Sequence, residues 1–173
     1  ASWRNGAVAI AYMGIALLRL AERGVIDLDA PIAAYLADSP SLADSPSLAD
    51  LPDAERITPR QLITMTAGVP DYVPDPGFAA ANAADPFRAW TADELIAYGI
   101  AQPPLFDPGT NWDYSHTAIV ILGEVMSAAA GIPLAEILRQ EVLEPLGLQR
   151  TVSEQTAAIP APFLNGFTGE RGI

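Results

Sequence analysis

The residues best suited to chemistry stand together in the run Asp113-Tyr114-Ser115-His116, which holds the single histidine of the chain. Serine, histidine and aspartate make up the hydrolytic triad, in which the serine attacks a carbonyl carbon and the histidine takes the serine proton. Adjacency argues against a triad here, because the members of a triad converge from separate elements whereas neighbouring side chains point apart. The sequence also lacks a Gly-x-Ser-x-Gly turn of the kind that exposes a nucleophilic serine. We therefore do not expect a triad.

The composition argues against a metal site, a phosphate-binding loop and nucleic-acid binding. One histidine, no cysteine and acidic residues without ligand spacing predict no metal site. No glycine-rich phosphate loop is present, so we expect no cofactor. The net charge of -12 argues against nucleic acid and anionic membranes as main partners, because both are bound by a basic face.

The elements that must position Tyr114 are predicted to be mainly helical, because few segments alternate at period two. Tyr114 lies just ahead of an apolar helix predicted over 117–130, which Gly131 would cap. A helix predicted over 7–23 is apolar on nearly all sides, so we expect it at the centre of the fold. Further predictions are helices over 31–35, 58–65, 91–99 and 133–143, a long ordered loop over 69–90 and an irregular tail over 151–173.

The length of 173 residues predicts one domain or most of one. A hexapeptide occurs twice in a row within 37–50, and we interpret it as a duplicated surface loop, since two short copies cannot build a repeat fold. The apolar run from Gly6 to Leu18 is shorter than the roughly 20 residues that span a membrane. It continues smoothly into an amphipathic helix end at Gly24, which favours a core helix over a signal peptide and leaves the compartment open.

Four motifs occur in order along the chain, at residues 24–31, 57–72, 108–115 and 143–148. Together they resemble the beta-lactamase-related serine hydrolases, which include class C beta-lactamases, D-alanyl-D-alanine carboxypeptidases, D-aminopeptidases and esterases. The resemblance covers almost the whole chain. It implies that residues 1–173 are a single partial domain: the helical subdomain of the α+β beta-lactamase and penicillin-binding-protein-like fold, with most of the antiparallel sheet missing. It also implies an extracytoplasmic, periplasmic or secreted location.

The resemblance further implies which positions carry the family's chemistry on amide, ester or beta-lactam substrates. The family uses a serine and a lysine in Ser-x-x-Lys at the start of the first helix, and these positions fall on Ala7 and Ile10. Tyr114 matches the tyrosine of a Tyr-x-Asn motif, in the general-base position, and His116 stands at the substrate-binding asparagine. A later Lys/His-Ser/Thr-Gly motif has no counterpart before Ile173. We expect Ala7, Ile10, Tyr114 and His116 to line one cleft.

These replacements predict a chain that does not form an acyl-enzyme, because alanine has no nucleophilic atom and the sequence contains no lysine at all. Three interpretations stay open. The chain is an inactive member of the family, a fragment that needs a second chain, or a non-catalytic module that binds a peptide or acyl ligand. Missing strands would leave an apolar face exposed, which predicts self-association or a complementary chain.

Overall fold

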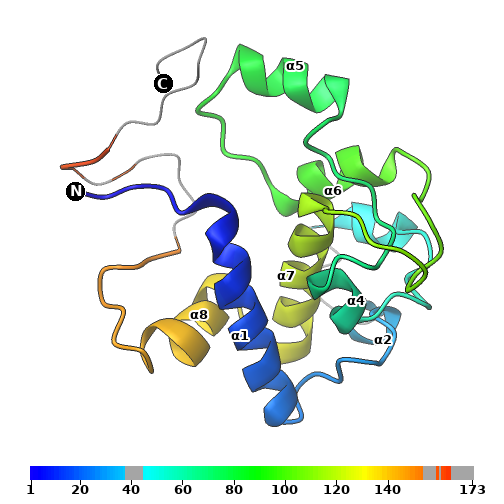
Figure 1. Ribbon diagram of the computed structural model, residues 1–173, viewed down its shortest axis with the longest axis horizontal. Helices are drawn as coiled ribbons and strands as arrows, with labels where there is room; N and C mark the ends of the chain where they lie inside the picture. Colours follow the sequence, from blue (N-terminus) through cyan, green and yellow to red (C-terminus); the bar gives the residue numbers. More distant parts are fainter. Residues whose placement is uncertain (38–44, 154–158, 160, 165–173) are drawn as a thin grey trace.

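The computed structural model describes residues 1–37, 45–153, 159 and 161–164, and within these ranges the chain is helical (Figure 1). The described residues contain no β-strand, only an isolated bridge between Ser2 and Phe163. The elements, in chain order, are η1 (Gly6–Val8), α1 (Ala9–Glu22), α2 (Ala33–Leu36), η2 (Pro46–Asp50), α4 (Pro59–Ile63), α5 (Pro76–Ala84), α6 (Ala92–Ile100), α7 (His116–Ala130), α8 (Leu134–Leu138) and η3, one π-helical turn (Arg139–Leu143).

The most enclosed helix is α7, which contacts α1, α2, α4, α6 and α8. Neighbours on most sides require apolar residues around most of its circumference, and the sequence of α7 supplies them. Its fully buried residues form the centre of the core: Thr117, Ala118, Ile121, Leu122, Val125 and Met126.

The helix expected at the centre, α1, is buried on one face only. Met13, Ala16, Leu17 and Leu20 pack inward, and the Met13 side chain approaches Gly123 of α7. The apolar residues on the opposite face are exposed, so the prediction of a central first helix was wrong. The apolar character of α1 reflects two faces, one packed on the core and one uncovered. The uncovered residues include Ala11, Ile15 and Leu18, together with the N-cap residue Val8.

An ion-paired cluster attaches α1 to the π-helical turn η3. Glu141 is buried, with 7% of its side chain exposed, and its carboxylate meets the guanidinium groups of Arg19 and Arg23. A buried carboxylate must be paired, because an isolated charge in the interior is strongly unfavourable. The pairing therefore fixes η3 against the C-terminal half of α1.

Helix termini follow the capping residues closely. Thr58 and Thr91 both form complete capping boxes, at the starts of two helices that the sequence predicted. Gly131 ends α7 in the left-handed conformation with φ of +68°. The N-cap of α7 is Ser115, whose Oγ accepts the N–H of Ala118, so the helix begins one residue earlier than predicted.

Several predicted boundaries differ from the structure. The predicted loop over 69–90 contains α5, which Asp75 caps and Pro76 opens at its first position. The helix predicted over 58–65 ends at Ile63, and Met65 turns the chain with φ of +62°. Residues 38–44 of the hexapeptide duplication lie outside the described residues. The described remainder includes η2, in which Leu48 is buried while Pro46, Ala49 and Asp50 are exposed; that the duplication forms a surface loop stays a prediction.

Candidate functional site

The segment that carries Tyr114 is held against the end of α4 by backbone hydrogen bonds. Asp113 N–H donates to the Met65 carbonyl at 3.1 Å, and Gly109 N–H donates to the Thr66 carbonyl at 2.8 Å. Farther along, Leu105 N–H donates to the carbonyl of Gly68 at 2.9 Å. These bonds fix the backbone on the N-terminal side of Tyr114.

Gly68 is required in this pairing. Its φ is +77°, and a Cβ there would overlap the backbone of Phe106. Both the left-handed conformation and the close backbone approach need a residue without a side chain.

A second set of hydrogen bonds joins residues 70–73 to the start of α7. Ser115 Oγ donates to the Pro70 carbonyl at 3.4 Å while it caps the helix. Tyr72 N–H donates to Thr117 Oγ1 at 3.0 Å, and the Thr117 side chain is fully buried against Gly99 of α6. Tyr114 is therefore held on both sides, by the α4 connection before it and by the capped start of α7 after it.

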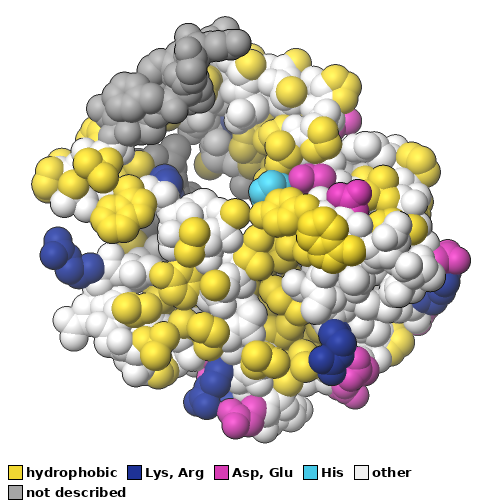
Figure 2. Space-filling model, in the orientation of Figure 1, with side chains coloured by type: hydrophobic (Ala, Val, Ile, Leu, Met, Phe, Trp, Pro, Cys, Tyr) yellow, Lys and Arg dark blue, Asp and Glu magenta, His cyan; other side chains and the backbone are white. Residues whose placement is uncertain are grey.

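Asp71 and His116 form the polar centre of the site. His116 Nδ1 lies 2.9 Å from Asp71 Oδ2, and the side chains are 36% and 16% exposed. The His116 ring also meets the Tyr114 ring edge to face, with ring centroids 4.9 Å apart. In Figure 2 the histidine, in cyan, reaches the viewed face among hydrophobic and acidic side chains. The site is thus an acid–imidazole pair beside an exposed phenol.

A cluster of aromatic rings packs against the Asp71–His116 pair. Tyr72 lies 6.0 Å from His116 by ring centroids, and Phe78 of α5 packs on Tyr72 edge to face at 4.8 Å. Phe78 in turn contacts Trp90 and Tyr98, at 5.1 and 5.8 Å. Helix α5, which the sequence did not predict, therefore supports the site through one aromatic side chain.

The surroundings of Tyr72 disfavour the ionised form of its phenol. Burial is the main cause that raises the pKa of Tyr72 above its ordinary value of 10.0, and the nearby Asp71 carboxylate and Tyr114 phenol raise it further. At neutral pH Tyr72 is therefore a protonated, half-buried phenol beside the acid–imidazole pair.

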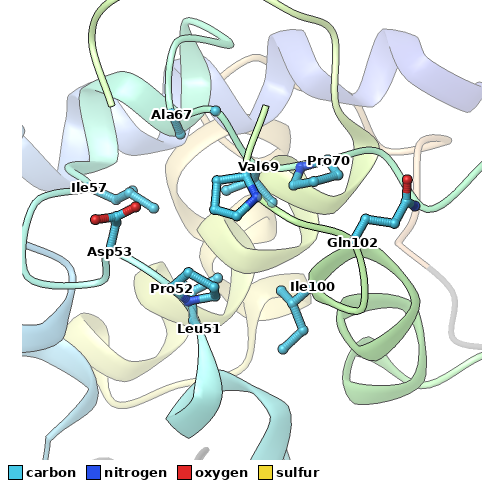
Figure 3. A pocket seen from close by; sticks show the side chains of 11 residues that line it. Leu51, Pro52, Asp53, Ile57, Ala67, Val69, Pro70, Ile100 and Gln102 are labelled. Carbon is cyan, nitrogen blue, oxygen red and sulfur yellow. The ribbon is translucent and has the colours of Figure 1, made fainter. Parts of the chain in front are cut away.

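Two hollows lie elsewhere. The first, shown in Figure 3, has a volume of about 10 Å³ and is lined mostly by apolar side chains, with Asp53 and Gln102 toward its two ends. That volume holds at most one water molecule. The second is an open groove of about 390 Å³ past the end of α1, where Arg60 pairs with Asp29 at 2.7 Å. Neither hollow includes Tyr114 or His116, so neither belongs to the acid–imidazole site.

Two further properties of the described residues bear on function. They contain no group of three or more His, Asp or Glu side chains placed to hold a metal ion. Within the same part of the chain, no single helix is long and apolar enough to cross a membrane; α7 and the α8–η3 segment pass the length and composition test only as a pair, bent by 82°.

The profile of the family named Beta-lactamase matches residues 2–172, which is nearly the whole chain. The chain belongs to the beta-lactamase family. Its helical elements correspond to a helical portion of the beta-lactamase and penicillin-binding-protein-like fold, as the sequence predicted.

Relatives of this beta-lactamase-family chain include proteins named as an esterase and as a penicillin-binding protein. Esterase EstB of Burkholderia gladioli is 29% identical over 173 residues, covering 95% of this chain and 42% of the relative. Penicillin-binding protein 4* of Bacillus subtilis is 24% identical over 150 residues, covering 81% of this chain and 28% of the relative. The chain thus spans less than half the length of these relatives.

Solved structures agree on the fold. A D-stereospecific amidohydrolase from Streptomyces superimposes with a TM-score of 0.73 at 31% identity, covering 85% of this chain and 43% of that one. The octameric penicillin-binding protein homologue from Pyrococcus abyssi superimposes with a TM-score of 0.60 at 25% identity, covering 83% of this chain and 31% of that one.

Of the four family positions expected to share a cleft, the structure brings Tyr114 and His116 into contact. Ala7 lies in η1, exposed, and Ile10 lies half-buried in the first turn of α1. That Ala7 and Ile10 face Tyr114 stays a prediction. Asp71 was given no role by sequence reasoning, because nothing local in Pro-Asp-Tyr reveals a partner 45 residues away.

Proposed function

We propose that this chain forms the helical wall of a beta-lactamase-family cleft and binds a small amide, ester or beta-lactam compound or a peptide without forming an acyl-enzyme. The observation that carries the proposal is the pair of apolar residues, Ala7 and Ile10, at the start of α1. A methyl group cannot attack a carbonyl carbon, and a butyl group cannot move a proton.

The arrangement of α1 and α7 supports a shared cleft. Both helices begin at the same end of the molecule and run side by side (Figure 1). The Met13 side chain approaches Gly123, so four residues back along each helix Ala9, the first residue of α1, comes level with Ile119 in the first turn of α7. At 1.5 Å of rise per residue, equal steps along two parallel helices keep their residues level. This register supports the placing of Ala7 near Tyr114 and His116.

Intact-mass measurement tests the lack of acylation. We expect no covalent adduct after incubation with a penicillin or with para-nitrophenyl acetate. A stoichiometric adduct that turns over would refute the proposal, and mapping it would identify the true nucleophile. An unreactive amide such as phenylacetamide should still bind, as judged by changes in the NMR signals of His116 and Tyr114.

A restoration experiment tests the assignment of the two positions. We expect Ala7→Ser with Ile10→Lys to gain acylation by the activated ester. The matched control is Val8→Ser with Ala11→Lys, which introduces the same side chains at the same spacing on neighbouring exposed positions. Acylation of the control to the same extent would contradict the assignment, because a surface serine would then suffice.

The exposed face of α1 favours a second proposal, that α1 is covered by another copy of this chain or by a complementary chain. Val8, Ala11, Ile15 and Leu18 follow one another at steps of three, four and three residues, which places them on one face of the helix. Ile15 is 42% exposed and Leu18 is 60% exposed. A structural relative described as octameric adds support for self-association.

Sedimentation equilibrium tests the second proposal. We expect the chain to associate, and Ile15→Glu with Leu18→Glu to shift it toward monomer because two charges cannot be buried unpaired. The matched control introduces one glutamate at Val152, which is equally apolar and 62% exposed but lies outside α1. Purely monomeric protein at high concentration would exclude self-association and leave only a complementary chain.

A further inference from the structure

The carboxylate of Asp71 binds both to the start of α7 and to its own turn. Oδ1 accepts the backbone N–H groups of Val73 at 3.1 Å and His116 at 3.3 Å. Oδ2 lies 2.9 Å from the His116 ring nitrogen Nδ1. The carboxylate therefore contacts both the backbone and the side chain of His116. These two contacts fix the position of the histidine and the orientation of its ring.

This contact determines where the proton of a neutral imidazole sits. An ionised carboxylate can only accept hydrogen bonds, so Nδ1 must be the donor in the Asp71 contact. A neutral imidazole carries one N–H, which leaves Nε2 with a free lone pair. Asp71 thus selects the tautomer in which Nε2 is a hydrogen-bond acceptor.

The ring is held so that Nε2 stays accessible. Tyr114 and Tyr72 contact the ring of His116, at centroid distances of 4.9 and 6.0 Å, and Asp71 occupies its Nδ1 side. More than a third of the side chain is still exposed, at 36%. Among the described residues, Nε1 of Trp90 is the one buried side-chain nitrogen that lacks a partner, so Nε2 of His116 is open to a ligand beside the Tyr114 ring.

We infer that Asp71 is a positioning residue that makes His116 present an accepting nitrogen beside Tyr114, so that the site takes ligands that donate an N–H. An asparagine, which the family resemblance implies at this position, would offer both a donor and an acceptor. A neutral His116 held by Asp71 offers an acceptor alone. It therefore favours an amide N–H over an ester, which has no proton to donate. The ligand part of this inference rests on the proposed binding function, whereas the tautomer part does not.

The tautomer can be read directly by NMR, because His116 is the only histidine and gives one set of ring signals. Long-range ¹H–¹⁵N spectra at about pH 8, where an ordinary imidazole is neutral, distinguish a protonated nitrogen from a free one. We expect Nδ1 to be protonated in the wild type. Asp71→Ala should move the proton toward Nε2 and shift both ring nitrogens.

Asp113→Ala is the matched control, because Asp113 is an exposed acid three residues from His116 in the chain. It should leave the tautomer unchanged. A wild-type ring protonated on Nε2, or an unchanged tautomer in Asp71→Ala, would overturn the inference. If Asp71→Ala does not fold, Asp71→Asn can replace it, because the amide oxygen still accepts the backbone N–H groups. The His116 tautomer is then compared between the wild type and a variant whose side chain at position 71 is uncharged.

The ligand class is tested with phenylacetamide and methyl phenylacetate, which differ in the N–H. We expect the amide to shift Nε2 of the wild type and the ester to leave it unchanged, and we expect the difference to disappear in Asp71→Ala. Equal shifts with both compounds would overturn the ligand class. No shift with either compound would overturn the proposed binding function as well, while the tautomer result would stand on its own.

Discussion

Gly99 offers the sharpest test of how the candidate site is supported. It lies in α6 against Thr117, and a Cβ at this position would be 2.9 Å from Thr117 Cβ and closer still to Oγ1 and Cγ2. Thr117 is fully buried and accepts the Tyr72 N–H. Gly99→Ala must therefore either rotate Thr117 away from Tyr72 or push α6 off α7.

The expected cost can be built from three contributions. Overpacking a core contact costs about 1–3 kcal/mol. Rotating Thr117 leaves the Tyr72 N–H without its acceptor, which costs about 1–3 kcal/mol more. Alanine offsets about 1 kcal/mol of this, because it is a better helix former than glycine. The net loss is roughly 1–5 kcal/mol, and a loss near 3 kcal/mol lowers the Tm by about 6–12 °C in a domain of this size.

Thermal and urea unfolding followed by circular dichroism measure the effect. Gly14→Ala is the matched control: it is also in a helix, but its new Cβ would meet only Ile63 Cγ1 at 3.9 Å, an ordinary contact. We expect Gly14→Ala to be neutral or to gain up to about 1 kcal/mol. Adding Thr117→Ala to Gly99→Ala should cost less than Thr117→Ala alone, because the two changes share one contact. A Gly99→Ala variant as stable as the wild type would refute this description of the α6–α7 contact.

Three further predictions concern the same region and the α1 attachment. Ser115→Ala should lose about 1–2 kcal/mol in urea unfolding, because it removes the N-cap bond to Ala118, whereas Ser115→Thr should retain most of the stability. Tyr72 has a raised pKa in the folded state, so the unfolded chain releases this proton first as the pH rises. Stability should therefore fall above about pH 10, and Tyr72→Phe should weaken that fall. Glu141→Ala should destabilise more than Glu22→Ala in thermal unfolding, since Glu141 is buried between two arginines and Glu22 is 70% exposed.

Local signals in the sequence predicted most helix starts and ends. Thr58, Thr91 and Gly131 act within one turn of the chain, so their roles can be read from the residues beside them. Helix α5 carried the same kind of signal in Asp75 followed by Pro76, but the surrounding prolines and glycines concealed it. The π-helical turn η3 has no comparable signature in the residues beside it; Glu141, Val142 and Leu143 are buried in it.

The site itself was only partly predictable. Tyr114 and His116 are two positions apart, and the family resemblance marked both. The Asp71 contact depends on the pairing of distant segments, and no periodicity records such a pairing. The pattern of apolar residues also could not predict which face of α1 is buried. Leu17 and Leu18 are equally apolar, but their side chains are 1% and 60% exposed.

The hydrogen bonds between residues 70–72 and 115–117 all join positions 45 residues apart. Closing a loop of that length costs roughly 3 kcal/mol plus a constant, by the logarithmic rule for flexible chains. The first of these hydrogen bonds to form incurs the entropic cost of closing the loop, and the others then form at no further closure cost. The site should therefore open and close as one unit, with the amides of Tyr72 and His116 exchanging their protons at similar rates. A single cut in the exposed helix α5 would divide the closed loop and loosen the acid–imidazole pair without altering any atom of it.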